Sequence, residues 1–98
     1  MKTPEIMQII ELLGKKWLMR IIWELRGEPL TFRELQSRCG DISPTVLNTR
    51  LRDLELNDLM LRSEGKGYRL SEIGLELLQV YKPLNEWAIR WVKLKGQL

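Results

Sequence analysis

The stretch from Ile42 to Leu61 constrains the fold of this chain more than any other segment. It opens with Ser43-Pro44, a side chain that can cap a helix followed by a residue suited to the first helical position. Apolar residues then recur at three- and four-residue spacing, which predicts a helix with one buried face. These apolar residues are Val46, Leu47, Leu51 and Leu54.

The opposite face of this predicted helix is polar. On a helical wheel of roughly 100° per residue, four hydrogen-bonding side chains gather there. They are Thr45, Asn48, Thr49 and Arg52. This composition suits a helix that enters the major groove of DNA by its N-terminal end. An ordinary solvated face would have the same composition, so the flanking segments decide between the two interpretations.

Composition limits the class of protein. With 98 residues, 44% of them hydrophobic, the chain predicts one domain over residues 1–98 with a single core. The net charge is only +3, so composition permits an anionic partner without requiring one. The sequence has no histidine, one cysteine, and neither a Gly-rich phosphate loop nor a nucleophile-elbow motif. We therefore expect that the protein is not an enzyme and that it binds no metal ion and no cofactor.

The same features indicate where the protein works. A lone cysteine, Cys39, suits a reducing compartment. No apolar run approaches the length of a membrane span, and the N-terminus lacks the pattern of a signal peptide. We expect a cytoplasmic protein without a membrane anchor.

The segment before the Ser43-Pro44 helix predicts a second, shorter helix. Residues 31–34 match a capping box, Thr31 followed three residues later by Glu34. The predicted buried positions are Phe32, Leu35 and Cys39. Gly40-Asp41 makes the turn, so residues 32–57 read as a helix-turn-helix whose second, recognition helix covers 44–57. Residues 28–30 are expected to form a short edge strand.

The segment after the recognition helix predicts a β-hairpin over residues 59–70. Two short strands flank the turn 63–67, where two glycines supply the positive φ that a tight hairpin needs. A hairpin in this position is a wing. Its basic residues are Arg62, Lys66 and Arg69. They are placed to contact phosphates beside the helix, or to protect the edge of a small sheet.

Helices are also predicted at both ends of the chain. Thr3-Pro4 is expected to cap a helix over 3–13, and Gly27 is expected to end a second helix in a left-handed conformation. Ser71 is expected to cap a last helix over 72–95, which Pro83 should kink or divide.

The end helices are too apolar for one small domain to cover, which favours a homodimer over a helix folded back on its own core. The predicted dimer residues are Ile6, Ile10, Leu77, Tyr81, Leu84, Trp87, Ala88 and Trp91.

Four segments carry a family resemblance: Leu13–Trp17 (LGKKW), Thr31–Leu35 (TFREL), Ile42–Leu47 (ISPTVL) and Arg50–Glu55 (RLRDLE). In order and spacing they resemble the HxlR-type winged helix-turn-helix regulators, relatives of the MarR group. The resemblance covers about residues 12–78. It implies a mainly α (α+β) winged-helix fold and a dimeric, sequence-specific DNA-binding regulator of transcription whose first and last helices form the dimer.

The chain departs from the family pattern at several positions. Asn57-Asp58 stands where the family often has Asp-Gly before the wing, and the wing turn is shorter than usual. Redox-sensing members carry a cysteine where this chain has Pro4, whereas Cys39 falls at a position that is usually apolar. We therefore assign Cys39 to the core rather than to thiol sensing.

The leading hypothesis is a dimer that places its recognition helices in successive major grooves of a roughly palindromic operator, about 34 Å apart. Asn48 and Arg52 are the candidates for base edges, because their side chains pair bidentately with adenine and guanine. The full predicted DNA-binding set is Ser43, Pro44, Thr45, Asn48, Thr49, Arg52, Arg62, Lys66 and Arg69, with Lys16 and Arg33 as weaker backbone candidates.

Two alternatives stay open. A winged-helix module that binds protein instead of DNA is favoured by the near balance of acidic and basic residues in 26–69 and by Leu56 beside the polar face. Acidic side chains or an exposed Leu56 within the basic face would point to that module. A regulator that responds to an unknown small molecule would need a pocket near Trp17, Trp23 and the last helix.

Overall fold

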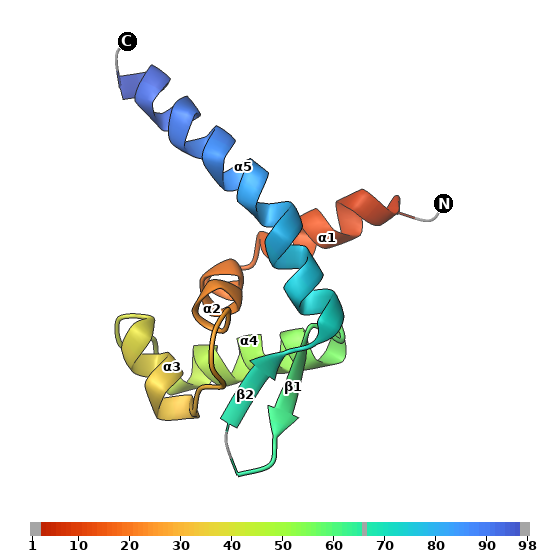
Figure 1. The fold of residues 1–98 in the computed structure, drawn as a ribbon, viewed down its shortest axis with the longest axis vertical. Coiled ribbons are helices and arrows are strands. Elements are labelled where there is room, and N and C mark those ends of the chain that lie inside the picture. Colours follow the sequence, from red (N-terminus) through yellow and green to blue (C-terminus); the bar gives the residue numbers. More distant parts are fainter. Residues whose placement is uncertain (1–2, 66, 97–98) are drawn as a thin grey trace.

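A computed structural model describes residues 3–65 and 67–96, which form five helices and a two-stranded antiparallel sheet (Figure 1). The elements are α1 (Glu5–Leu13), α2 (Leu18–Glu24), α3 (Phe32–Arg38), α4 (Pro44–Leu56), β1 (Met60–Ser63), β2 (Gly67–Leu70) and α5 (Glu72–Gly96). The predicted mainly α winged helix-turn-helix fold is confirmed: α3 and α4 form the helix-turn-helix, and β1 and β2 form the wing.

The core lies between α2, α3, α4 and the base of the wing. Its largest fully buried side chains include Leu18, Ile21 and Ile22 of α2, Leu35 of α3, and Leu47 and Leu54 of α4. Cys39 is buried in the same cluster, as predicted, whereas Phe32 and Val46 are only partly buried at its margin. The apolar stripe of α4 therefore faces α2, and its polar face is left outside.

Local capping positions both helices of the helix-turn-helix as predicted. The Thr31 hydroxyl accepts from the Glu34 amide at 3.2 Å, and the Glu34 carboxylate accepts from the Thr31 amide at 2.9 Å. The hydrogen bond from the Thr31 amide is the main cause that lowers the pKa of the Glu34 carboxyl. The Ser43 hydroxyl accepts from the amide of Val46 at 3.1 Å. The turn between the helices takes two left-handed residues, Gly40 and Asp41.

The wing pairs Met60 with Leu70 at its base and Ser63 with Gly67 near its tip. The predicted edge strand over 28–30 is wrong in extent: Leu30 alone pairs with Tyr68, through two backbone hydrogen bonds of 3.0 and 2.7 Å. The preceding residue is Pro29, which has no amide hydrogen to extend the ladder. Gly67 adopts a φ of 91°, and a Cβ at this position would collide with the Leu30 carbonyl group.

Two helix boundaries differ from the prediction. Pro4, not Thr3, is the N-cap of α1, and the Thr3 carbonyl accepts from the Gln8 side chain at 2.9 Å instead. Gly27 does not take a left-handed conformation. Helix α2 already ends at Glu24, and the Leu25 and Arg26 amides donate to the Ile22 and Trp23 carbonyls three residues earlier.

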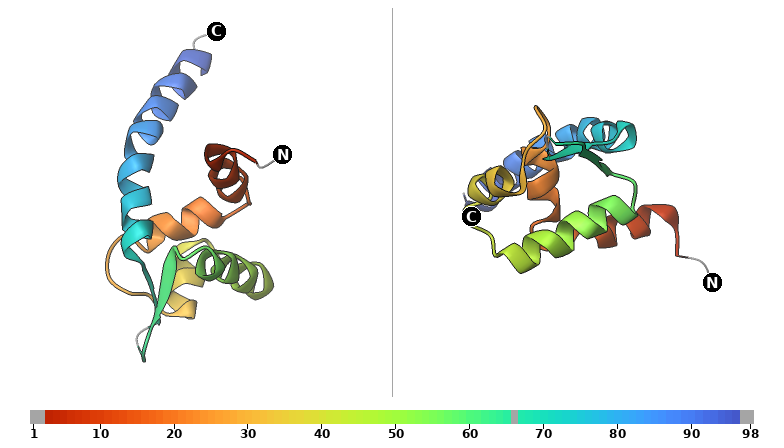
Figure 2. Two further views of the ribbon diagram at one scale, coloured as in Figure 1. Left: turned by 90° about the vertical axis from the view of Figure 1, so that its right-hand side faces the viewer. Right: turned by 90° about the horizontal axis from the view of Figure 1, so that it is seen from below.

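The two end helices extend away from this core (Figures 1 and 2). Helix α5 continues through Pro83 and bows along its length (Figure 2), so of the two expected effects of this proline, a kink or a division, the division does not occur. Its buried residues are Gly74 and Leu78, both near its start, and α1 has none. Within residues 3–65 and 67–96, no helix combines the length and apolar composition that crossing a membrane requires.

Candidate nucleic-acid interface

The four polar residues predicted to face DNA lie together on the exposed side of α4. Thr45, Asn48, Thr49 and Arg52 are all exposed, and with Asp53 they line a shallow hollow of about 290 Å³. The Thr49 hydroxyl donates to the Thr45 carbonyl at 2.9 Å, so it is left to act as an acceptor. The geometry therefore presents an amide, a guanidinium and two hydroxyl side chains on one exposed face of α4.

The N-terminus of α4 carries the predicted Ser43 and Pro44, both exposed. The Ser43 hydroxyl is already bonded to the Val46 amide, so its part is to shape the helix start. Because Pro44 has no amide hydrogen and the Val46 amide is bonded to Ser43, the Thr45 amide is the first-turn donor that remains for an anion at this end.

The wing places its two described basic residues differently. Arg62 donates from Nε to Oε2 of Glu55 at 2.9 Å, and this hydrogen bond raises the pKa of Arg62. Its guanidinium also lies 5.5 Å from the centre of the Tyr68 ring. Arg69 is exposed, and Lys66 lies outside the described residues. Glu55 therefore partly neutralises the charge that Arg62 would offer to a phosphate.

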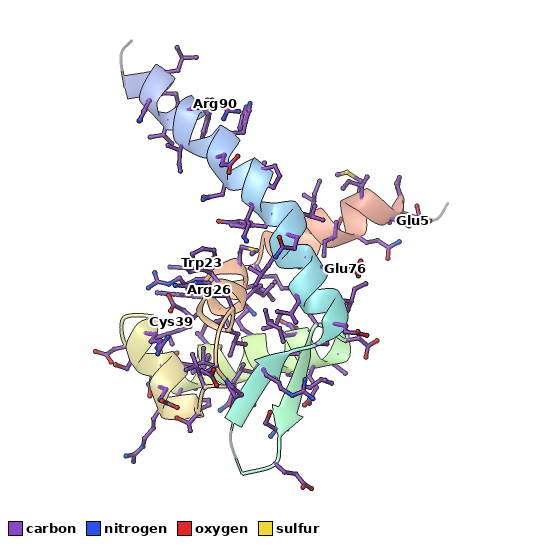
Figure 3. All side chains as sticks on the ribbon, viewed as in Figure 1. Glu5, Trp23, Arg26, Cys39, Glu76 and Arg90 are labelled. Atoms are coloured by element: carbon purple, nitrogen blue, oxygen red, sulfur yellow. The ribbon has the colours of Figure 1, made fainter. Side chains whose placement is uncertain are left out.

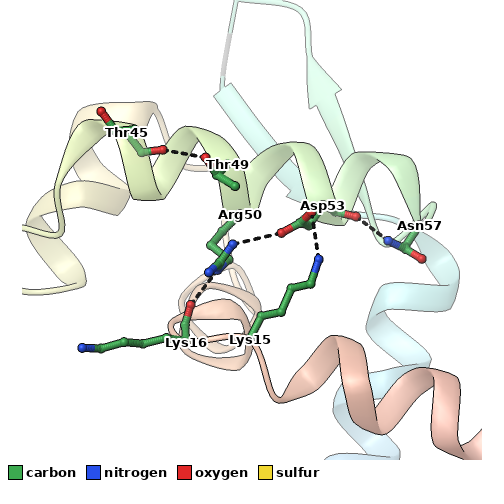
Figure 4. A network of polar contacts seen from close by, with 7 residues as sticks. All are labelled: Lys15, Lys16, Thr45, Thr49, Arg50, Asp53 and Asn57. Carbon is green, nitrogen blue, oxygen red and sulfur yellow. Dashed lines mark hydrogen bonds and ion pairs between the residues drawn. The ribbon is translucent and has the colours of Figure 1, made fainter.

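The weaker backbone candidates lie on separate elements. Arg33 is exposed in the first turn of α3, and Lys16 is exposed in the turn between α1 and α2. The backbone carbonyl of Lys16 accepts from Nε of Arg50 at 2.7 Å (Figure 4).

The sequence analysis missed the polar contacts that surround this hydrogen bond (Figure 4). Arg50 Nη1 lies 3.2 Å from Asp53 Oδ2, and Lys15 Nζ lies 3.3 Å from Asp53 Oδ1. The three-residue spacing of Arg50 and Asp53 beside the buried leucines was a visible signal for their own ion pair. Nothing local indicated that residues 15 and 16 would meet them.

Two of the acidic residues that favoured a protein-binding module have basic partners. Asp53 faces Lys15 and Arg50, and Glu55 faces Arg62. Leu56, in contrast, is 75% exposed at the end of α4. Both Asp53 beside the polar residues of α4 and the exposed Leu56 are features expected of the protein-binding module, although Asp53 is paired with basic side chains.

A second hollow, of about 440 Å³, opens between α2 and α5. Its lining residues are Met19, Arg20, Trp23, Tyr81 and Asn85. Figure 3 shows Trp23 of α2 beside Arg26, which follows the end of this helix, and the Arg26 guanidinium lies 4.2 Å from the centre of the Trp23 ring. The rings of Trp23 and Tyr81 are tilted at 47°, with 6.5 Å between their centres. Trp17 lines a different depression, so it does not join Trp23 as expected.

Two further observations bear on chemistry. Burial raises the pKa of the Cys39 thiol, which keeps the thiol protonated and unreactive. The part of the chain that the structure describes holds no group of three or more His, Cys, Asp or Glu side chains placed to bind a metal ion.

The residues predicted to form a dimer are mostly exposed in the single chain. Ile6, Ile10 and Leu84 are exposed, whereas Leu77, Tyr81 and Ala88 are partly buried. Trp87 and Trp91 stack with 5.9 Å between ring centres and stay 51% and 46% exposed.

Known proteins share this fold and sequence pattern. A family model described as HxlR-like helix-turn-helix matches residues 12–95. The HTH-type transcriptional regulator YodB of Bacillus subtilis (strain 168) is 32% identical over 91 residues, which cover 87% of this chain and 81% of YodB. The crystal structure of quinone-bound YodB superposes with a TM-score of 0.83 at 32% identity, over 91% of this chain and 99% of that chain. A possible HxlR family transcriptional factor from Thermoplasma volcanium GSS1 gives a TM-score of 0.74 at 29% identity, over 92% of this chain and 83% of its own.

The Glu55–Arg62 pair predicts that Glu55→Gln strengthens DNA binding. Without the Glu55 carboxylate, Arg62 becomes available to one more phosphate. The affinity for random duplex should therefore rise several-fold, and the slope of log K against log salt concentration should steepen by about 0.9. The measurement is fluorescence anisotropy at several salt concentrations. Glu86→Gln, which makes the same charge change on the polar face of α5, is the control. Equal effects of the two variants would attribute the gain to net charge alone.

Proposed function

The chain belongs to the HxlR-like helix-turn-helix family, and from this premise we propose that it acts as a homodimer on a roughly palindromic operator. HxlR family members are DNA-binding regulators of transcription, not enzymes, and this protein is a DNA-binding transcriptional regulator. The finer steps of operator recognition, the dimer and the response to small molecules are part of the proposal. We place the protein in the cytoplasm, where an unpaired cysteine stays reduced.

One observation carries the proposal: the predicted reading residues lie together on the exposed face of α4. A major groove about 12 Å wide admits a helix, and its base edges match the side chains present. Asn48 would pair with an adenine and Arg52 with a guanine. Thr45 and Thr49 would contact bases or phosphates. Ser43 and Pro44 would bring the start of the helix to a phosphate.

The wing and the outer turns would supply backbone contacts. Arg69 and Lys66 would contact phosphates beside the groove, and Arg62 would do so after exchanging Glu55 for a phosphate. Lys16 and Arg33 would contact the backbone on the other side of α4. Such contacts set the position of the protein on DNA without reading sequence.

The exposed apolar surfaces of α1 and α5 support a homodimer. Two half-exposed tryptophans leave apolar surface in water, and burying that surface in an interface would stabilise a small chain of 98 residues. Rigid aromatic side chains are also favoured at the centre of interfaces. A two-fold axis through these helices would place two copies of α4 about 34 Å apart, one helical turn of DNA.

We expect Asn48→Ala and Arg52→Ala to lower the preference for operator over random duplex by about 1–3 kcal/mol each, because each removes a bidentate base contact. The measurement is fluorescence anisotropy on duplex from the upstream region of the protein's own gene, with random duplex alongside. Arg90→Ala, on the part of α5 that extends from the core, is the matched control (Figure 3).

An unchanged preference in both variants would contradict base reading by α4. Equal wild-type affinity for both duplexes would leave a non-specific DNA-binding protein. If folded wild-type protein bound neither duplex at low salt, the protein-binding module would take the place of the proposed function.

We expect Trp87→Lys to weaken the dimer at least a hundredfold, because it buries a charge in an apolar interface. The measurement is light scattering across a concentration series, in which wild type should give twice the chain mass of 11.6 kDa. Glu86→Lys places the same side chain one residue earlier, on the polar face, and should leave the dimer intact. A wild-type monomer at micromolar concentration would contradict the dimer and the half-site spacing.

The hollow between α2 and α5 supports a second role, binding of a planar aromatic effector. Trp23 and Tyr81 supply aromatic walls, Arg20 and Asn85 supply polar groups, and the solved relative YodB is described as quinone-bound. The buried, protonated Cys39 makes non-covalent binding the expected mode. In calorimetric titrations with naphthoquinone, Trp23→Leu should weaken binding about tenfold and Trp17→Leu should not. Absence of saturable binding to wild type would contradict this role for a quinone.

A further inference from the structure

Two polar contacts tie α4 to the turn between α1 and α2, and a third links the two α4 side chains that make them. Arg50 donates from Nε to the Lys16 carbonyl at 2.7 Å and pairs through Nη1 with Asp53 at 3.2 Å. Asp53 also forms an ion pair with Lys15, with 3.3 Å between Oδ1 and Nζ. We name this group, Lys15, Lys16, Arg50 and Asp53, the α4 clamp (Figure 4). It joins residues 34 positions apart in the sequence.

The clamp is better shielded than a surface ion pair. The side chains of Arg50 and Asp53 are only 20% and 18% exposed, so water and salt screen their interaction less than that of an open pair. The guanidinium is planar, and its two bonds leave in fixed directions, one to the turn and one along α4. A planar group held at two points restricts the rotation of α4 about its own axis.

The turn that the clamp holds is itself unusual. Trp17 has a φ of 78°, a left-handed conformation that costs a bulky residue about 1–3 kcal/mol. The carbonyl that Arg50 bonds belongs to the peptide that leads into Trp17. The strained turn, which joins α1 to α2, is thus braced from α4.

We propose that Arg50 and Asp53 are positioning residues for DNA recognition: through the Lys15–Lys16 turn they set the orientation of α4 relative to α1. Asn48 and Arg52 lie on the adjacent face of the same helix, and recognition demands that such side chains be held within about 10–20° of their productive orientation. Because α1 belongs to the proposed dimer surface, the clamp also transmits the geometry of the dimer to the reading face. The consequence for DNA rests on the proposed function.

The decisive variant is Asp53→Asn, because net charge and positioning predict different effects on the ratio of operator affinity to random-duplex affinity. Net charge alone should leave this ratio unchanged, whereas positioning should lower it. Loss of the carboxylate makes the protein more positive, so electrostatics alone would raise its affinity for every duplex. Positioning predicts instead that the ratio of operator to random affinity falls about tenfold. Glu86→Gln makes the same charge change on α5 and should leave the ratio unchanged.

Two substitutions of Arg50 separate the effect of its charge from the effect of its planar shape. Arg50→Lys keeps the charge but loses the planar fork, and Arg50→Met keeps only the apolar stem. The affinity ratio should fall in both, less in Arg50→Lys than in Arg50→Met. A fully retained ratio in Arg50→Met would overturn the proposal.

A readout without DNA tests the clamp by itself. Amide hydrogen exchange of free, folded protein, followed by NMR, should become about tenfold faster over residues 15–18 in Asp53→Asn and stay unchanged in Glu86→Gln. Unchanged exchange in Asp53→Asn, with both duplexes bound more tightly by the same factor, would overturn the clamp. A wild type that fails to distinguish operator from random duplex would overturn the proposed function, and the exchange rates would still decide whether α4 braces the turn.

Discussion

The packing of one side of α4 on α2 is the interaction on which the rest of the structure depends. Leu47, Leu51 and Leu54 are buried against the cluster that contains Ile21 and Ile22. Truncating a single leucine of this kind costs about 2–5 kcal/mol, a large part of the stability of a small domain. Because the helix has a period of 3.6 residues, burying this stripe leaves the polar residues outside. The polar face of α4 is exposed because the opposite face of the helix is buried in the core.

Charge is arranged around this helix by pairing rather than by excess. The net charge of the chain is only +3, and the acids near the reading face are each engaged by a base, Asp53 by Arg50 and Glu55 by Arg62. These pairs differ in burial. The shielded pair holds the helix in place, whereas the exposed pair on the wing is open to exchange with phosphate. In our proposal the shielded pair would stabilise the orientation of α4, and the exposed pair would modulate the affinity for DNA.

The end helices extend the molecule beyond what one core can cover. Helix α5 has buried residues near its start and then leaves the core (Figure 1). The isoleucines Ile6 and Ile10 of α1 are exposed to solvent. In a homodimer these surfaces would meet a second copy, and the turn after α1 would connect that interface with α4. The strained Trp17 stands at this connection, between the helix that would join the copies and the helix that would read DNA.

The sequence by itself determined those parts of the protein whose signals lie within a few residues of one another. The capping box at Thr31, the Ser43-Pro44 start and the leucine stripe of α4 are of this kind. Together with the family motifs, they were enough for the fold and for the polar face of α4.

The tertiary structure alone decided which distant groups meet. The bond from Arg50 to the Lys16 carbonyl, the pairing of Arg62 with Glu55 and the placing of Trp23 beside Tyr81 each join different elements. It also decided that Leu30 pairs with Tyr68 as a single residue and that Trp17, not Gly27, takes the left-handed conformation. Local propensity acts over one helical turn, whereas the partner of a long side chain depends on how the elements pack. No pattern along the chain contains that information.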